Sequence, residues 1–290
     1  MIAVPVARRA ARKLGVPLWL HVQDFEVGAA LATGLMGKGK RTVEAALRFE
    51  QRMLDAADIV STISPAMRTL LIGKGMDAER LVELRNWANH ADAVRASDGA
   101  KLKREWGLTG KTVALYSGNI SHKQGLDVVI DAARRLAGRG DLVFVIAGEG
   151  PKRREIACAA EALPNVVMQG LQPDIMVGEL LSMADIHLLP QIEGAADLVL
   201  PSKIGNMLAS GRPVVATARR DTGIAAELEG CGAVVPPSDP AALALAIEAL
   251  AGDPGKRKTL GENGRAFATT RWAKRAVVDA FEDRMQLLLS

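Results

Sequence analysis

Short apolar segments rich in β-branched residues alternate along the whole chain with longer amphipathic segments rich in Ala, Leu and Arg. A strand, a helix and a further strand form a βαβ unit, and repeated units build a parallel sheet with helices on both faces. The fold class is therefore α/β with doubly wound parallel sheets. The predicted strands are 18–21, 58–63, 81–84, 112–116, 142–147, 165–168, 186–189, 213–216 and 233–235. The predicted helices lie near 41–56, 65–74, 125–138, 152–162, 174–183, 203–210, 221–229 and 239–251.

The length of 290 residues suits two domains, because one domain typically takes about 100–200 residues. Polar and small residues interrupt the alternation at 86–111, which indicates a boundary, and a short basic helix is expected around 101–106 within it. The strand–helix repeats from 112 to about 254 predict one complete doubly wound domain, whereas the part before them has too few strands for such a sheet. We therefore expect a partial N-terminal domain at 1–88 and a complete C-terminal domain at 89–270.

The final segment, 271–290, is predicted to be a helix with an apolar stripe that includes Trp272, Val277, Phe281 and Met285. Two placements fit this stripe. The helix either covers the core of the second domain or crosses back onto the first.

Composition and spacing exclude several classes of protein. Cys158 and Cys231 lie far apart and have no Cys or His at metal-ligand spacing, so neither a disulfide scaffold nor a zinc site is expected. No segment approaches the roughly 18–20 apolar residues of a spanning helix. The first charges follow the apolar residues of the N-terminus, which is the reverse of a secretory signal. A cytoplasmic location is therefore expected.

The net charge is only +4, but basic residues gather in two clusters, at 8–13 and 38–41. Such clusters are often a solvated face, and they also suit an anionic membrane surface. With one Tyr and five Phe, the chain has little with which to stack nucleic-acid bases, so nucleic acid is not an expected partner. Peripheral association with the inner face of the cytoplasmic membrane remains an alternative to a purely solvated face.

Glycines and cations follow two neighbouring strands where ligands bind in open α/β sheets. After 112–116 come Gly118 and Lys123, which together outline a phosphate site, although Gly and Lys are also common in ordinary turns. After 142–147 come Glu149 and Gly150. This second turn either only ends a strand and starts a helix, or it points Glu149 into the cleft.

A third group of polar residues follows the predicted strand 186–189. Ser202 is expected to cap the helix that begins at Lys203. A lysine in the first turn of a helix opposes the helix dipole, so Lys203 is favourable there when an anion is bound. A bound diphosphate would provide that anion.

Three segments, Gly-Asn-x-x-x-Lys-Gln-Gly at 118–125, Ala-Gly-Glu-Gly-Pro at 147–151 and the Pro-Ser-Lys segment at 201–216, resemble the donor-binding domain of GT-B glycosyltransferases of the family 4 type. The bacterial colanic-acid and O-antigen group is the part of the family that the chain resembles most. Residues 19–24, 64–65 and 86–89 are similar to the first domain and interdomain turn of that family. The resemblance implies Rossmann-like domains and a nucleotide-sugar donor held by the second of them.

The resemblance implies that Lys123 and Lys203 contact the donor diphosphate and stabilise the leaving group, with Ser202 assisting. No cofactor or metal is expected, since the chain has no Asp-x-Asp motif. The chain departs from the family at three positions: Asn119 stands where Arg is usual, and the paired Glu positions hold Leu198 and Asn206. Asn206 is expected to contact the ribose in place of the second Glu. The expected donor-binding residues are Gly118, Asn119, Lys123, Glu149, Gly150, Asp197, Leu198, Ser202, Lys203 and Asn206.

His21 and Asp24 place an imidazole and a carboxylate after the first predicted strand. The resemblance implies that this edge faces the sugar, with Asp24 as base or sugar-orienting group and His21 in the complementary role. His187 is expected to be an ordinary strand residue. Ser61, Thr62 and Ser64 have no nearby His in the sequence and no G-x-S-x-G elbow, so hydrolase chemistry is not expected.

Only about fifteen residues precede the segment that resembles the first domain of the family, so a truncated first domain is expected. The favoured function is transfer of a sugar from a nucleotide-diphosphate sugar to a polyprenyl-diphosphate-linked or saccharide acceptor in cell-surface polysaccharide synthesis. The alternatives are a non-catalytic nucleotide-sugar-binding remnant and, less favoured, a GT-B sugar-nucleotide epimerase.

Overall fold

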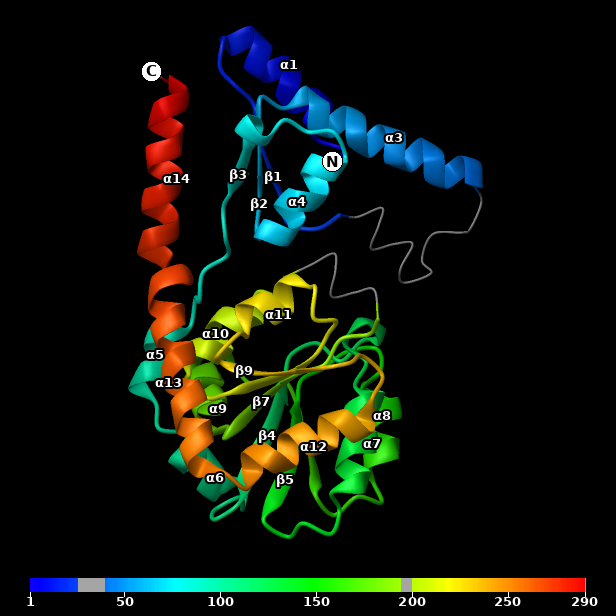
Figure 1. The fold of residues 1–290 in the computed structure, drawn as a ribbon, viewed down its shortest axis with the longest axis vertical. Helices are drawn as coiled ribbons and strands as arrows, with labels where there is room; N and C mark the ends of the chain where they lie inside the picture. The colour runs from blue at the N-terminus through cyan, green and yellow to red at the C-terminus, as the bar shows by residue number, and fades with distance from the viewer. Residues whose placement is uncertain (26–39, 194–199, 290) are drawn as a thin grey trace. The chain divides into compact units, whose positions relative to one another are not determined.

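The computed structural model describes residues 1–25, 40–193 and 200–289, and it divides into two compact units (Figure 1). Unit 1 takes in Met1–Asn86 and the C-terminal Arg275–Ser290. Unit 2 takes in Trp87–Ala196 and Pro201–Lys274. Apart from Leu200, which is grouped with unit 1, the described chain leaves unit 1 after Asn86 and returns to it after Lys274.

Unit 2 is built on a six-stranded sheet with the order β6-β5-β4-β7-β8-β9, in which every pairing is parallel. When the strands of this sheet are numbered 1 to 6 from β4 to β9, their order is the doubly wound arrangement 3-2-1-4-5-6. The direction of this order reverses between β4 and β7. The predicted α/β class and all six predicted strands are confirmed. The strands are β4 (Thr112–Ser117), β5 (Leu142–Ala147), β6 (Val166–Gln169), β7 (Ile186–Leu189), β8 (Val214–Thr217) and β9 (Gly232–Val235).

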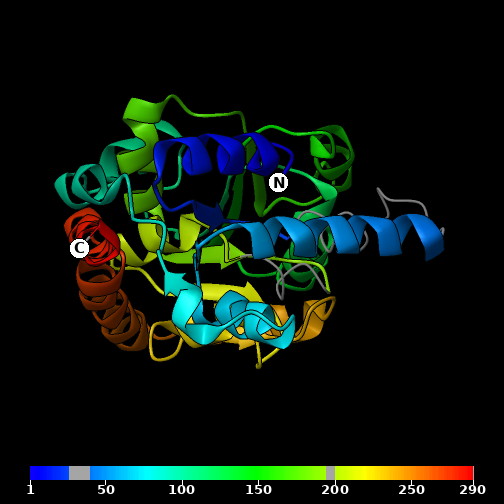
Figure 2. The same ribbon diagram turned by 90° about the horizontal axis from the view of Figure 1, so that it is seen from above.

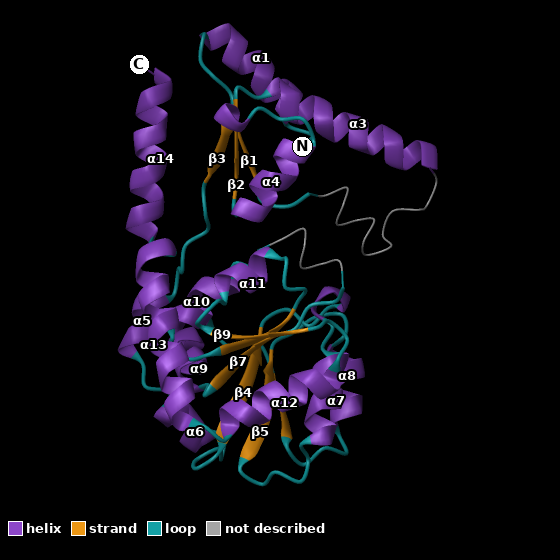
Figure 3. Cartoon of the chain, in the orientation of Figure 1, coloured by secondary structure: helices purple, strands orange, loops and turns teal. Residues whose placement is uncertain are grey.

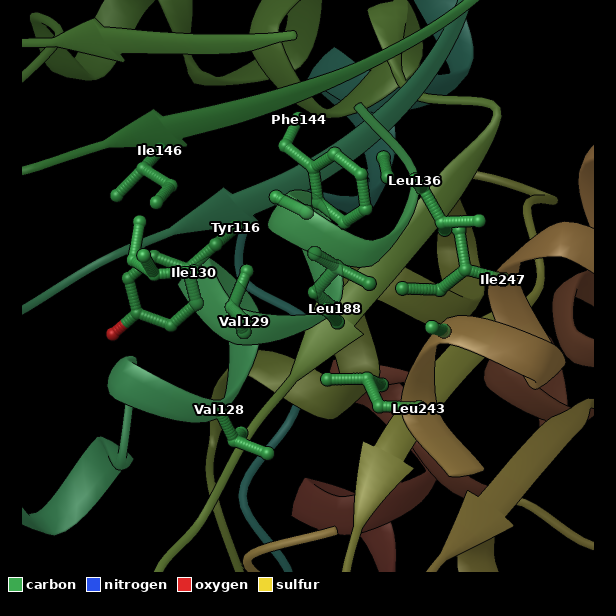
Figure 4. Packing of buried hydrophobic residues seen from close by; sticks show 14 of the residues in the cluster. Tyr116, Val128, Val129, Ile130, Leu136, Phe144, Ile146, Leu188, Leu243 and Ile247 are labelled. Atoms are coloured by element: carbon green, nitrogen blue, oxygen red, sulfur yellow. The ribbon is translucent and has the colours of Figure 1, made fainter. Parts of the chain in front are cut away.

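Helices cover both faces of this sheet, because alternate side chains of a strand point to opposite faces. Tyr116 of β4 packs into one cluster with Val129 of α7 (Asp127–Arg135) and Ile247 of α12 (Pro240–Ala251) (Figure 4). Ala114 of β4 belongs to the same cluster. Val113 and Leu115 pack into a second cluster on the other face. Both faces of β4 are therefore dry, which explains its continuous apolar sequence.

The helices of unit 2 agree with the predictions except at two places (Figure 3). Helix α5 lies within the segment expected to be a polar boundary, and α13 fills 254–271, for which no helix was predicted. The helices are α5 (Ala91–Ala96), α6 (Ala100–Glu105), α7 (Asp127–Arg135), α8 (Arg153–Ala160), α9 (Val177–Met183), α10 (Lys203–Ala209), α11 (Gly223–Glu227), α12 (Pro240–Ala251) and α13 (Pro254–Arg271), with short 3-10 turns η2 (His122–Gln124) and η3 (Asp174–Met176).

In unit 1 the described strands form a parallel sheet with the order β1-β2-β3. The middle strand is fully buried, whereas β1 lies at an edge and is partly exposed. Helix α3, the long light-blue helix of Figure 2, was predicted, whereas α1 was not. The elements are α1 (Val4–Leu14), β1 (Trp19–Val22), α3 (Lys40–Ala56), β2 (Ile59–Thr62), α4 (Pro65–Gly73), η1 (Ala78–Arg80), β3 (Leu81–Glu83) and α14 (Lys274–Leu289).

The last helix, α14, packs within unit 1. The ring of Phe281 meets the edge of Trp19 at a centroid distance of 5.1 Å. Arg284 donates a hydrogen bond of 3.1 Å from Nη2 to the carbonyl of Glu79. In the described ranges, no helix combines the length and apolar character that crossing a membrane requires.

Candidate functional site

The reversal of strand order between β4 and β7 marks the place in unit 2 where a ligand crevice is expected, outside the carboxyl ends of the strands. The loop after β4 begins at Gly118, and the chain after β7 leads to α10 at Lys203. At Gly125, a Cβ would lie 3.0 Å from Cγ2 of Ile192. The backbone N–H of Ile192 also donates to the carbonyl of Lys123 at 3.2 Å. The loops that follow β4 and β7 are therefore in direct contact.

The loops after β4 and β5 are joined by backbone hydrogen bonds. The N–H of Ile120 donates to the carbonyl of Glu149 at 2.8 Å, and the N–H of Lys152 donates to the carbonyl of Ile120 at 3.0 Å. A Cβ at Gly148 would lie 1.9 Å from the carbonyl oxygen of Gly118, and Gly148 has φ +149°. Only glycine fits this approach, so the glycines hold the two loops together as one platform.

Lys203 places its ammonium group beside Gly118. Its Nζ lies 4.3 Å from the centroid of the Tyr116 ring and would be 3.6 Å from a Cβ on Gly118. Burial of the ammonium lowers the pKa of Lys203 to about 8, although part of the side chain remains accessible. Within the described ranges no carboxylate forms an ion pair with it. The site therefore holds a partly desolvated cation without a counter-charge, which suits an anionic ligand.

Tyr116 supports both Lys203 and the loop that begins at Gly118, and nothing in its local sequence indicated this role. Its ring packs among Val129 and Ile130 (Figure 4), while its hydroxyl donates to the carbonyl of Asn119 at 2.5 Å. Burial raises the pKa of the Tyr116 hydroxyl, so the phenol stays protonated and keeps donating. One side chain thus supports both Lys203 and the Gly118 loop.

Three other predicted residues lie on the same loops. Lys123 is in the 3-10 turn η2, and its side chain is exposed. Asn119 is exposed, and its Oδ1 would lie 2.5 Å from a Cβ on Gly150, so the two residues pack closely. Glu149 is exposed and pairs with Nε of Arg153 at 3.2 Å. Glu149 is therefore engaged with the helix that follows its own turn.

Two predicted residues, Ser202 and Asn206, lie just before α10 and within it. Ser202 precedes the helix, but it has helical backbone angles and makes no side-chain cap hydrogen bond, so the predicted side-chain cap is wrong. Asn206 is held by the segment before α5: its Nδ2 donates to Oδ1 of Asn89 at 2.8 Å, and its Oδ1 accepts from the N–H of His90 at 3.0 Å. These two bonds use one N–H and one oxygen lone pair of the amide and fix its orientation, and the ribose contact of Asn206 stays a prediction. Asp197 and Leu198 lie outside the described residues.

His187 has the structural role that the sequence predicted. It is fully buried in β7, and its Nε2 lies 2.9 Å from Oγ of Ser210. Burial, with smaller contributions from the charges of Arg212 and Lys203, lowers the pKa of His187 to about 3. The imidazole is therefore neutral at physiological pH and is not a candidate acid or base.

In unit 1, His21 and Asp24 are both exposed after or at the end of β1. Nδ1 of His21 lies 2.8 Å from Oγ of Ser61, and Nε1 of Trp19 donates to the same oxygen at 2.8 Å. No hydrogen bond or ion pair between His21 and Asp24 is found among the described residues. Ser61, which the sequence offered no reason to select, is therefore the partner of His21. Burial lowers the pKa of His21 below its usual value.

Two α/β units with parallel sheets, the second of them doubly wound, are the architecture of the GT-B type. The structure superposes on Anabaena HepE in complex with UDP with a TM-score of 0.76 at 22% identity, covering 99% of this chain and 76% of that one. It also superposes on WaaG, a glycosyltransferase involved in lipopolysaccharide biosynthesis, with a TM-score of 0.63 at 20% identity, covering 76% of this chain and 61% of that one.

The chain belongs to the group 1 glycosyl transferases: the model of the family described as "Glycosyl transferases group 1" matches residues 98–267, and a "Glycosyl transferase 4-like domain" matches 2–87. It is 40% identical over 229 residues to the putative colanic acid biosynthesis glycosyl transferase WcaI of Escherichia coli, which covers 77% of this chain. It is 27% identical over 277 residues to the α-D-kanosaminyltransferase of Streptomyces kanamyceticus, covering 93% of this chain and 70% of that protein. The chain spans 56% of the length of the E. coli relative.

Proposed function

We propose that the protein transfers a sugar from a nucleoside-diphosphate sugar to a lipid-linked or saccharide acceptor in the synthesis of a cell-surface polysaccharide. The observation that carries this proposal is the ammonium group of Lys203, which lies beside Gly118 at the reversal of strand order and has no carboxylate partner among the residues that the structure describes. The family and the colanic-acid relative support the reaction class. The structural relative HepE forms a complex with UDP, which supports a nucleotide ligand.

In this proposal, Lys203 neutralises the negative charge that develops on the departing nucleoside diphosphate. A fixed cation in a partly dry site stabilises such charge more strongly than the same cation in water. The Gly118 loop allows close backbone approach to a phosphate, and the exposed Lys123 adds a second cation at the rim. We further propose that this lysine pair supports transfer without a metal ion, and that the anomeric configuration is retained, as the family resemblance implies.

His21 and Asp24 are proposed to act on the acceptor side of the reaction. Asp24 is exposed and is therefore able to reach an acceptor hydroxyl as a base. The E. coli relative is a colanic acid biosynthesis enzyme by name, so a polyprenyl-diphosphate-linked saccharide is the proposed acceptor class.

Transfer is tested with radiolabelled UDP- and GDP-sugars, a polyprenyl-diphosphate-linked saccharide and EDTA in the assay. We expect a labelled lipid product with the wild-type chain and at least tenfold less with Lys203→Met or Asp24→Asn. Product formation that survives both substitutions unchanged would refute these roles, and complete dependence on added metal would refute metal independence. Proton NMR of the product reports the anomeric configuration.

A nucleotide-sugar-binding protein without transfer is the second candidate, favoured by one observation. Within the described residues the sheet of unit 1 has three strands, whereas the sheet of unit 2 has six. Nucleotide binding by calorimetry without labelled product under any acceptor condition would select this candidate over the enzyme.

Helix α1 supports a proposal of peripheral membrane association at the cytoplasmic face. Arg9, Arg12 and Lys13 are exposed on it together with the apolar Val6 and Leu14. Exposed cations and apolar side chains on one helix suit an anionic bilayer surface. Sedimentation with phosphatidylglycerol vesicles is expected to carry the protein down at low salt, and an Arg9→Gln, Arg12→Gln, Lys13→Gln variant to reduce this. Equal sedimentation of the variant would contradict the proposal.

A further inference from the structure

The register of β1 and β2 brings Trp19, His21 and Ser61 together on one face of the sheet in unit 1. Trp19 and His21 are two residues apart on β1 and therefore point to the same face. His21 is aligned with Ser61 of β2. The Ser61 Oγ atom lies 2.8 Å from Nε1 of Trp19 and 2.8 Å from Nδ1 of His21. The three side chains thus form a continuous hydrogen-bonded chain.

The donors in this chain are fixed by its chemistry. An indole N–H only donates, so Ser61 accepts from Trp19. Ser61 is fully buried, and in the part of the chain that the structure describes no acceptor other than Nδ1 of His21 is hydrogen-bonded to its hydroxyl. A buried hydroxyl that donates to nothing is unfavourable. The Ser61 hydroxyl therefore donates its proton to Nδ1 of His21.

We propose that Ser61 and Trp19 are positioning residues that fix the tautomer of neutral His21, with the ring proton on Nε2. Nδ1 is occupied as an acceptor, and no described residue is hydrogen-bonded to Nε2 of the exposed His21. His21 then donates a hydrogen bond to a substrate oxygen and does not remove a proton at Nε2. Asp24 is left as the base. Only the use of His21 in transfer rests on the proposed function; the tautomer does not.

The C-terminal helix takes part in the same arrangement. Phe281 of α14 meets Trp19 with an interplanar angle of 62° and a centroid distance of 5.1 Å, an edge-to-face contact. This contact holds the indole ring in the position from which its N–H reaches Ser61. A residue near the end of the chain thus contributes to the orientation of His21.

The tautomer is measured directly by long-range ¹H–¹⁵N NMR on the full chain at pH 8, where an exposed histidine is neutral. The chain has four histidines, and the signal of His21 is identified by its loss in His21→Gln. We expect nearly pure Nε2–H tautomer in the wild type. A dominant Nδ1–H tautomer would overturn the proposal. This measurement on the wild type tests the tautomer without any variant of Ser61.

Two variants test whether Ser61 and Trp19 cause the Nε2–H tautomer of His21. Ser61→Ala removes the donor, so both tautomers are expected and the Nδ1 resonance should move to that of an imidazole in water. Trp19→Phe keeps an aromatic ring beside Phe281 but removes the indole donor, and it should weaken the bias. Ser182→Ala, a buried serine of unit 2 that donates to the carbonyl of Val94, is the matched control and should leave His21 unchanged. An unchanged His21 spectrum in folded Ser61→Ala would refute the proposal.

Activity separates this inference from the proposed function. If the enzyme transfers sugar, Ser61→Ala is expected to lower kcat at least fivefold with little change in KM for the donor, because the orientation of His21 changes while the site of unit 2 does not. If the wild-type protein has a pure Nε2–H tautomer but transfers no sugar, the proposed transfer function is refuted, whereas the hydrogen-bonded chain of Trp19, Ser61 and His21 is supported. Transfer with a mixed wild-type tautomer would refute the role of the hydrogen-bonded chain alone.

Discussion

Lys203 is the residue that matters most for the proposed site, because its ammonium group is largely desolvated and no carboxylate of the described part of the chain pairs with it. A lysine whose pKa falls to about 8 is largely neutral at pH 9, whereas a bound diphosphate raises that pKa again. Binding therefore takes up a proton above pH 8.

The affinity for UDP is predicted to fall by up to about tenfold per pH unit above pH 8, where Lys203 loses its proton. Calorimetry at pH 7 and pH 9, in two buffers of different ionisation enthalpy, measures both the affinity and the proton uptake. A Lys203→Arg variant, whose guanidinium stays charged, should show no such fall; an equal fall in both proteins would assign the effect to another group.

The lowered pKa of His187 predicts that the free energy of unfolding decreases as the pH falls. Its pKa of about 3 in the folded protein lies below the unfolded value near 6.5, so the folded state favours the neutral ring. The stabilisation is complete above pH 6.5 and is lost as the pH falls towards 3. At pH 5 this loss is expected to be about 2 kcal/mol relative to pH 7. Urea unfolding at both pH values, compared with His187→Gln, isolates this contribution; identical pH dependence in the two proteins would contradict it.

Among the secondary-structure elements, the glycine platform after β4 and β5 shapes the site. Gly148→Ala is predicted to destabilise unit 2 by about 2–4 kcal/mol, because its Cβ would lie 1.9 Å from a backbone oxygen at a positive φ. Gly138→Ala is the control, since no atom lies within 4 Å of its Cβ and no positive φ is involved. Thermal unfolding of both variants makes the test, and similar melting temperatures would show that the platform tolerates a side chain.

The sequence predicted every strand of the two described sheets, because each strand is a short apolar run between turn residues. It missed α13, whose interior contains Gly261 and Gly264 and therefore has a low helix propensity. The structure explains these glycines: a Cβ at Gly261 would lie 2.0 Å from the carbonyl oxygen of Gly211, so the helix needs glycine to pack closely. Tertiary packing thus overrode the local signal.

The candidate site was predictable where a residue directly follows a strand or begins a helix, as Gly118 and Lys203 respectively illustrate. Tyr116 and Ser61 were not, because each gained its role from a partner far away in the sequence or across the sheet. Asn206 is similar, since its amide is bound by residues more than one hundred positions earlier. Buried polar contacts of this kind leave no local pattern in a single sequence.

Across the molecule as a whole, the chain returns to unit 1 through α14. Phe281→Ala should remove the edge contact with Trp19 and destabilise unit 1 locally by about 1–2 kcal/mol. Hydrogen exchange is expected to quicken at the amides of β1 and β2 and to stay unchanged at β4. Equal acceleration in both units, or none in β1, would contradict a local role for this helix.

Binding of a nucleoside diphosphate to unit 2 through Lys203 underlies the whole proposed function, and calorimetric titration of UDP and GDP in the presence of EDTA tests it. We predict binding of one of them to the wild type, with affinity about 10- to 100-fold lower in Lys203→Met, as expected for the loss of a charge-assisted hydrogen bond. Lys256→Met, a substitution of an exposed lysine of α13, should leave binding as in the wild type. Equal affinity in Lys203→Met and the wild type, or no binding of either nucleotide, would contradict this role of Lys203.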